Sequence, residues 1–189
     1  MLFRSRFTEV CDEAIKRGIR VRGDISVCLG CPYDGEVAPA QVTAVARELY
    51  AMGCYEICIA DTIGVGVPSQ VSEIIGRARA ALPGMRLRAH FHNTRNTGLA
   101  NAYAAVEAGV SALDSSAGGI GGCPFAPAAT GNIPTEDLVY MLERMGVRTG
   151  VNLDALIATG EWLQGTLGRP IPSMLLKAGS FPKPATQAA

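Results

Sequence analysis

The hydrophobic and polar positions of the chain follow two alternating periods. Segments with apolar residues three or four apart, the spacing of one helix face, are followed by segments in which apolar and polar residues alternate, as in a half-buried strand. The first pattern predicts helices at 2–17, 39–52, 68–82, 97–108 and 135–145. The second predicts strands at 19–27, 55–60, 87–92 and 110–114. Four strands, each followed by a helix, predict a parallel α/β protein.

Proline and glycine mark the ends of the predicted helices. Pro39 and Pro68 stand where two helical patterns begin, and proline suits a first helical turn because its missing N–H would have no partner there. Gly18 ends the first helical pattern, and the pair at 83–84 ends the third. These breaks support the predicted alternation.

Polar residues that could carry chemistry fall at the carboxyl ends of the predicted strands or in the loops that follow. They are Asp61, His92, Ser115, Ser116, Cys123 and Asn132. Active sites of (β/α) barrels lie at this edge, whereas a doubly wound sheet favours a G-x-G-x-x-G turn after its first strand, and none follows Val27. A complete barrel has eight strands and about 250 residues. We therefore predict about four βα units, or half of a TIM barrel.

The chain divides into a barrel-like part and a C-terminal part. Residues 1–150 carry the βα pattern and are predicted to form the half-barrel domain, and residues 151–189 a C-terminal helix and tail. Within this part, the last thirty or so residues, ending in FPKPATQAA, have the character of a frayed tail.

Charge and hydropathy favour a small-molecule partner. Seventeen basic and seventeen acidic residues cancel, and no segment gathers a basic run, so neither nucleic acid nor an anionic membrane surface is expected as a partner. No apolar run approaches the roughly 20 residues of a membrane span. Met1 leads directly into an amphipathic pattern without a signal or transit peptide, and we expect a cytoplasmic protein.

The only two histidines of the chain lie one residue apart in the predicted strand at 87–92. The alternation places His90 and His92 on one face, about 6 to 7 Å apart along the strand. Two imidazoles at this spacing suit one divalent ion, which would need further oxygen or nitrogen ligands from elsewhere. The alternative is a pair of half-buried polar residues without a ligand.

The six cysteines do not suggest a disulfide framework. Cys11, Cys54 and Cys58 lie in predicted helix or strand sequence, where reduced core thiols are expected. A four-cysteine zinc site from the pair at 28 and 31 with the pair at 54 and 58 is a weaker alternative, because the second pair has the wrong spacing. Cys123 differs, since it lies within GGIGGCPFAP in the long loop 115–134, and loops of this length are usually functional.

Several longer motifs carry a resemblance to a known family. They are GCPY at 30–33, MGCYEI at 52–57, DTIGVG at 61–66, HFH at 90–92, and DSSAGGIGGCPF with ATGNIPTEDLVYML thereafter. With these motifs, the chain from Val21 to about Leu153 resembles the C-terminal half of the 3-hydroxy-3-methylglutaryl-CoA (HMG-CoA) lyases, metal-dependent acyl-CoA lyases on the TIM barrel.

The resemblance implies a site and a reaction. It implies that His90, His92 and Asn132 are ligands of Mg²⁺ or Mn²⁺, that Cys123 is a catalytic thiol, that Asp61 is an active-site carboxylate, and that Glu136 lies near the site. The implied substrate is an acyl-CoA, cleaved to acetyl-CoA and acetoacetate in leucine degradation, with Asp61 placed to act as base and Cys123 to relay or donate a proton. From the residues alone, other interpretations remain: a cap or loop carboxylate for Asp61, a left-handed turn for Asn132, and a structural thiol for Cys123.

Two departures from the family pattern shape the expectations. Asn93-Thr94-Arg95-Asn96 replaces the commoner Asp-Thr-Tyr-Gly, which leaves the acyl group open, and the Arg-Asp-Gly of the family's first strand does not occur. We expect the chain to be a fragment, a truncated reading frame or half of a split enzyme. We also expect it to form a homo-oligomer or to be completed by an N-terminal half barrel. The alternatives are a related acyl-CoA lyase, a synthase of the same superfamily that condenses acetyl-CoA with a 2-oxo acid, and a non-catalytic association module.

Overall fold

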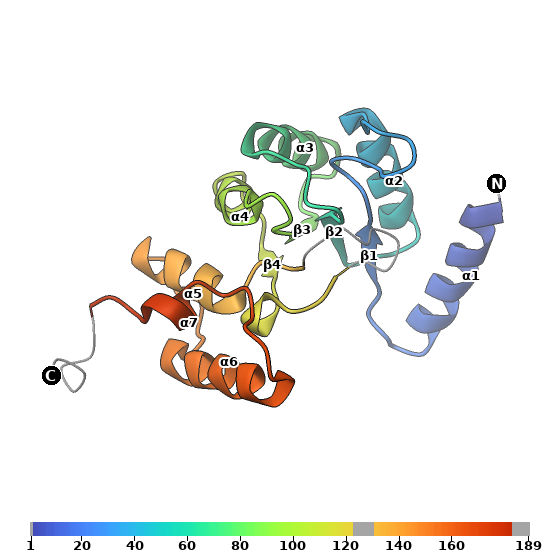
Figure 1. The fold of residues 1–189 in the computed structure, drawn as a ribbon. Coiled ribbons are helices and arrows are strands. Elements are labelled where there is room, and N and C mark those ends of the chain that lie inside the picture. The colour runs from blue at the N-terminus through green and yellow to red at the C-terminus, as the bar shows by residue number, and fades with distance from the viewer. Residues whose placement is uncertain (1, 123–130, 183–189) are drawn as a thin grey trace, which may run out of the picture. The chain divides into compact units, whose positions relative to one another are not determined.

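The computed structural model describes residues 2–122 and 131–182 of the chain. Its internal contacts define two compact units, Met1–Asp114 and Ser115–Ala189. The first holds the sheet and four helices, and the second holds the remaining helices (Figure 1). These units are defined by contacts within the chain and do not test the predicted domain boundary after residue 150, which stays a prediction.

A four-stranded parallel sheet forms the centre of the first unit. Its strands, in spatial order, are β1 (Arg22–Ile25), β2 (Glu56–Asp61), β3 (Arg86–Phe91) and β4 (Ala112–Asp114). Each strand pairs with its neighbour in sequence, which is the order found in a (β/α) barrel. The four predicted strands are confirmed.

The first strand is shorter than the predicted 19–27. Val27 has a positive φ of 53°, and its backbone N–H donates to Oγ1 of Thr62 at 2.9 Å. Because a left-handed residue breaks the extended backbone, β1 ends before it, at Ile25. Alternation of side chains cannot reveal such a turn, since it reports side-chain polarity and not φ.

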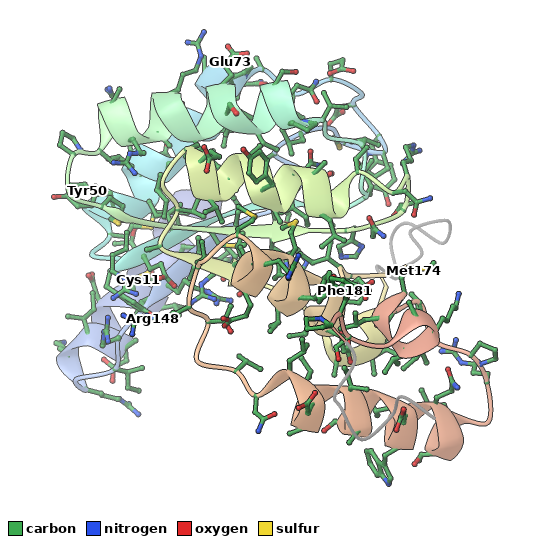
Figure 2. The ribbon with its side chains drawn as sticks, turned by 90° about the vertical axis from the view of Figure 1, so that its left-hand side faces the viewer. Cys11, Tyr50, Glu73, Arg148, Met174 and Phe181 are labelled. Carbon is green, nitrogen blue, oxygen red and sulfur yellow. The ribbon has the colours of Figure 1, made fainter. Side chains whose placement is uncertain are left out.

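Helices follow the first three strands. They are α2 (Pro39–Ala51), α3 (Pro68–Ala81) and α4 (Gly98–Glu107), lying side by side along one face of the sheet (Figure 1). α2 and α3 begin with the prolines expected at those positions. Glu73 lies on the solvent side of α3 (Figure 2), where it pairs with Arg77 at 2.9 Å.

The helix-facing side of the sheet is the core. Its side chains from β2 and β3 are at most 2% exposed: Ile57, Ile59, Leu87, Ala89 and Phe91. Burial of each large apolar side chain contributes about 1.5 to 3 kcal/mol. Since a slip of one residue would expose all of them, this face fixes which side chains stand on the other side of the sheet. That other side carries Glu56, Arg88 and His90, whereas Asp61, at the end of β2, falls on the helix-facing side.

The first helix, α1 (Leu2–Lys16), is confirmed, but most of its apolar stripe is not core. Cys11 is buried (Figure 2), whereas Val10 and Ile15 are 65% and 45% exposed. Across the described residues, no helix has the length and apolar character needed to cross a membrane.

The second unit contains a 3₁₀ turn, η1 (Ala117–Gly119), and the helices α5 (Thr135–Arg144), α6 (Leu153–Leu167) and α7 (Leu175–Ala178). The carboxylate of Asp137 accepts hydrogen bonds from the Ser173 hydroxyl and from the N–H groups of Met174 and Leu175, at 2.8 to 3.0 Å. Ile171 and Leu175 are buried. The prediction of a frayed tail is therefore wrong as far as Ala178, where α7 ends, because one carboxylate and two apolar side chains anchor the segment.

Candidate active site

β3 brings the two histidines together at the carboxyl edge of the sheet. Their ring centres are 5.2 Å apart and their planes are inclined by 55°. An ion about 2.1 Å from a ring nitrogen lies roughly 3.2 Å from the ring centre, so two rings at about 90° to 110° around one ion have centres roughly 4.5 to 5.2 Å apart. The observed separation of His90 and His92 therefore fits joint coordination of one ion.

The two imidazoles have different surroundings. His92 is 5% exposed, and its Nδ1 has no hydrogen-bond partner. Burial, followed by the nearby His90, lowers the pKa of His92, which favours the neutral ring that metal coordination requires. His90 is more open, with its Nδ1 3.8 Å from Oδ2 of Asp114. An unpartnered buried nitrogen on a neutral ring beside a second imidazole fits a divalent cation.

Charged side chains continue from His90 along the same face of the sheet. Arg88 donates through Nε to Oε2 of Glu56 at 2.8 Å and through Nη1 to Oδ1 of Asp114 at 2.5 Å. Glu56 is fully buried, and the nearby His90, with further contributions from Arg88 and Arg22, lowers the pKa of Asp114 to about 2. The carboxylate opposite His90 is therefore ionised throughout the physiological pH range.

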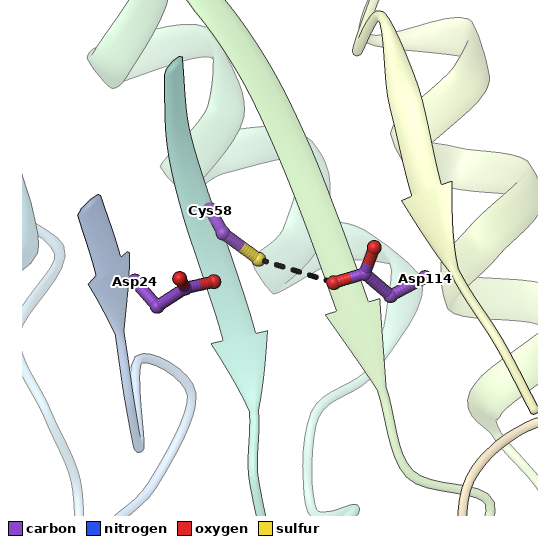
Figure 3. A group of neighbouring side chains, drawn as sticks. All are labelled: Asp24, Cys58 and Asp114. Carbon is purple, nitrogen blue, oxygen red and sulfur yellow. Dashed lines mark hydrogen bonds between the residues drawn. The ribbon is translucent and has the colours of Figure 1, made fainter. Parts of the chain in front are cut away.

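Asp24, Cys58 and Asp114 lie close together on this face (Figure 3). The Cys58 thiol is 4.0 Å from Oδ2 of Asp114, and burial, then the charges of the two carboxylates, raises the pKa of this thiol. The predicted site residues did not include Arg88, Glu56 or Asp114. These residues lie on three different strands, and the alternation within one strand cannot show which residues of different strands pair.

Asp61 lies at the end of β2, and its carboxylate organises the loop that follows. Oδ1 accepts from the N–H of Val65 at 3.0 Å and Oδ2 from the N–H of Gly66 at 2.9 Å, and the side chain is fully buried. These contacts correspond to the loop-carboxylate interpretation. A role of Asp61 as base stays a prediction.

Two side chains from the segment after β3 hold the same loop. Asn101, fully buried on α4, donates to the carbonyl oxygen of Gly66 at 2.9 Å. Arg95 donates through Nη1 to the carbonyl oxygens of Ile63 and Gly64, at 3.2 and 3.1 Å. The loop after the second strand is thus tied to the loop that follows the histidines.

The second unit holds two further predicted site residues. Nδ2 of Asn132 donates to the carbonyl oxygen of Ile120 at 3.1 Å, which leaves its Oδ1 available as a ligand atom. Glu136 is fully buried, and burial is the main cause of its raised pKa. The structure brings His90 and His92 together, and the joining of Asn132 and Glu136 to them stays a prediction.

The cysteine predictions have mixed outcomes. Cys123 lies outside the described residues, and its catalytic role stays a prediction. Cys11, Cys54 and Cys58 are buried and unbridged, as predicted, and Cys28 and Cys31 are unbridged as well. No four-cysteine cluster with metal-binding geometry forms among the described residues, where the only such group is Asp24, Cys58 and Asp114. For the described chain, the zinc alternative is therefore wrong.

Consecutive parallel strands with an imidazole pair at their carboxyl edge define a barrel-type α/β protein with a candidate metal centre. The family model described as HMGL-like matches residues 3–163. The chain belongs to this family, as the motifs indicated.

Individual relatives agree with the family assignment. The mitochondrial hydroxymethylglutaryl-CoA lyase of Bos taurus is 46% identical over 173 residues, covering 92% of this chain and 53% of the relative. The (R)-citramalyl-CoA lyase of Chloroflexus aurantiacus is 49% identical over 155 residues, covering 82% of this chain and 49% of the relative. The chain thus spans about half the length of the curated relatives it matches.

A solved structure supports the fold. The HMG-CoA lyase from Acinetobacter baumannii, in complex with coenzyme A and 3-methylmalate, has a TM-score of 0.89 and 39% identity, covering 94% of this chain and 58% of that one. The predicted fold class, part of a TIM barrel, is confirmed.

Proposed function

We propose that this chain belongs to a divalent-metal-dependent acyl-CoA lyase that cleaves (S)-3-hydroxy-3-methylglutaryl-CoA to acetyl-CoA and acetoacetate, as in leucine degradation. The observation that carries the proposal is the pair His90 and His92, with ring centres 5.2 Å apart, in a chain 46% identical to a lyase of that name. His90, His92 and Asn132 are the proposed ligands of Mg²⁺ or Mn²⁺.

The ligand set suits a hard cation. Neutral imidazoles and an amide oxygen bind Mg²⁺ or Mn²⁺, with a carboxylate or water completing the coordination. The lowered pKa of His92 keeps its ring neutral, so a cation need not displace a proton there. When bound, the cation supplies a Lewis acid that polarises the oxygens of the substrate.

Side chains of the protein would carry out the proton transfers. Asp61 is the proposed base for the substrate hydroxyl proton, after which the O–H electron pair forms the ketone of acetoacetate and the C2–C3 pair passes to the thioester fragment. Cys123 is the proposed donor that protonates C2 of this fragment. Glu136 is proposed to act near the site, and its raised pKa means that it retains a proton more readily than a surface carboxyl group.

A second candidate is the cleavage of a related acyl-CoA. The 49% identity to an (R)-citramalyl-CoA lyase and the Asn93-Thr94-Arg95-Asn96 segment after the histidines favour it. Both candidates break a carbon-carbon bond next to a hydroxyl-bearing carbon, so they share the proposed metal centre and differ in the acyl group.

Cleavage assays with the two acyl-CoA substrates, combined with Mn²⁺ titration followed by electron paramagnetic resonance, test the proposal. The chain of 189 residues alone is expected to bind metal weakly and to show little or no lyase activity. Once an N-terminal half barrel completes it, we expect turnover of about 1 to 10³ per second with the preferred substrate, loss of turnover with EDTA, and tighter Mn²⁺ binding in the presence of an acyl-CoA product analogue. A completed barrel that binds no Mn²⁺ and cleaves neither substrate would contradict the proposal.

The cellular location and the assembly are also proposals. We propose a cytoplasmic location, and a homo-oligomer or completion by an N-terminal half barrel, because the described sheet has four strands where a closed barrel has eight. Fractionation and a native mass measurement would test them.

A further inference from the structure

We propose that Asp114 is a positioning residue for His90, which holds the proton of that imidazole on Nδ1 and leaves Nε2 free to coordinate the cation. Asp114 ends β4 directly opposite His90 in the parallel register, and its Oδ2 lies 3.8 Å from Nδ1. The inference rests on the proposed function, since it assigns His90 to the metal.

Asp114 is itself held in place. Arg88 binds its Oδ1, and Arg22 lies 3.9 Å from its Oδ2. Arg88 is in turn anchored by Glu56, which is fully buried. A carboxylate held from two sides has little freedom to turn away from the imidazole. The ion pairs across the sheet therefore fix the group that faces His90.

A fixed carboxylate beside Nδ1 selects one tautomer of the ring. A proton on Nδ1 is stabilised by the negative charge, so the lone pair resides on Nε2. Partners of this kind orient metal-binding histidines in many proteins, and their loss typically costs about 10- to 100-fold in metal affinity. Nδ1 of His92 has no counterpart of Asp114, since it is buried without a hydrogen bond. Asp114 thus distinguishes His90 from His92.

Asp114 also belongs to a group that could be taken for a cation site of its own, with Asp24 and Cys58 (Figure 3). Arg22 already pairs with Asp24 at 3.0 Å, and Arg88 with Asp114. The Cys58 thiol retains its proton, since burial and the two carboxylates raise its pKa. Arg88 also pairs with Glu56, whose other oxygen lies 3.5 Å from Arg86. Three guanidinium groups thus face three carboxylates, and the group is an anchor for Asp114.

The first measurement needs no metal. In the metal-free wild-type protein at mildly alkaline pH, the ¹⁵N shifts of the His90 ring report which nitrogen carries the proton. We expect Nδ1–H in the wild type and a loss of this preference in Asp114→Asn. Asp24→Asn is the matched control, because it removes the same charge from the same group without a contact to His90.

The second measurement is the dissociation constant for Mn²⁺, by electron paramagnetic resonance. We expect a rise of about 10- to 100-fold for Asp114→Asn and less than about 2-fold for Asp24→Asn. A wild-type His90 protonated on Nε2 overturns the positioning role even if Asp114→Asn fails to fold. Equal effects of the two variants on Mn²⁺ affinity overturn it as well. Absence of Mn²⁺ binding by the wild type, with Nδ1–H observed, contradicts the proposed function and leaves the positioning role standing.

Discussion

Both carboxylate oxygens of Glu136 accept a hydrogen bond from the single backbone N–H of Gly118, at 2.8 and 2.9 Å. Gly118 has a φ of 67°, a conformation that glycine adopts without strain, and the contact closes the turn η1 against the start of α5. One N–H shared by two oxygens only partly satisfies a fully buried carboxylate. Burial accordingly outweighs this bond in the raised pKa of Glu136.

The stability of the protein should therefore depend on pH through Glu136. Its pKa is higher in the folded than in the unfolded state, so its contribution is fully present below the unfolded pKa and is lost as pH rises through the folded pKa. As pH rises through the folded pKa of Glu136, we expect the free energy of unfolding of the wild type to fall relative to that of Glu136→Gln. Urea titrations at a series of pH values from acidic to neutral measure this difference.

Glu143→Gln gives a control of opposite sign. Hydrogen bonds from the Thr149 side chain and backbone lower the pKa of the exposed Glu143, so its contribution is present above the unfolded pKa and is lost as pH falls through the folded pKa. The same trend with pH in both variants would contradict the assignment of the Glu136 effect to burial.

The sequence predicted the parts of the fold and of the candidate site that depend on local pattern. The placement of His90 and His92 on one face could be predicted, because alternation is a property of one strand. The pairing of Asp114 with His90 could not, since it depends on the register between β3 and β4. The anchoring of the segment at Ser173 by Asp137 was missed for the same reason, as no periodicity links an acidic residue on one helix to a later turn.

The two thiols of the C-x-x-C segment should differ in reactivity. Cys28 is fully buried, its thiol donates to the carbonyl oxygen of Ile25 at 3.0 Å, and burial raises its pKa to about 12. Cys31 is partly exposed. Since the thiolate is the reactive form, we expect iodoacetamide to label Cys31 and spare Cys28 in the native protein, as measured by peptide mass spectrometry. Labelling of both in urea is the control, and native labelling of Cys28 at a comparable rate would contradict this environment.

Arg95 should stabilise the loop after β2. Its guanidinium donates hydrogen bonds to the carbonyl oxygens of Ile63 and Gly64. Hydrogen bonds from a charged donor contribute about 1.5 to 3 kcal/mol to stability when buried. Because Arg95 is exposed, we expect a contribution of about 1 kcal/mol. We expect Arg95→Ala to lower the free energy of unfolding by that amount and to speed amide exchange at Gly64 and Val65.

Arg77→Ala is the control for Arg95→Ala. It also removes an exposed arginine, but the lost ion pair with Glu73 lies within one helix. An exposed pair of this kind contributes about 0.3 to 0.5 kcal/mol. Equal losses in the two variants, with unchanged exchange at Gly64, would show that Arg95 does not hold the loop.

Asp61 allows its two possible roles to be separated. Asp61→Asn keeps the shape of the side chain but replaces one acceptor oxygen with an NH₂ group, which would face the N–H of either Val65 or Gly66. A buried N–H left without an acceptor costs about 1 to 3 kcal/mol. We expect a loss of stability in this range, together with a fall in turnover if the carboxylate is also the base.

Asn101→Ala decides between these roles, because it releases the same loop at Gly66 and leaves the Asp61 carboxylate in place. Stability is measured by urea titration, and turnover at saturating substrate. If Asp61 is the base, Asp61→Asn lowers turnover far more than Asn101→Ala at a similar loss of stability, since general base catalysis contributes about 10²- to 10⁴-fold. If the two variants lose turnover in proportion to stability, Asp61 acts on catalysis only by shaping the loop, and the base must be sought elsewhere in the chain.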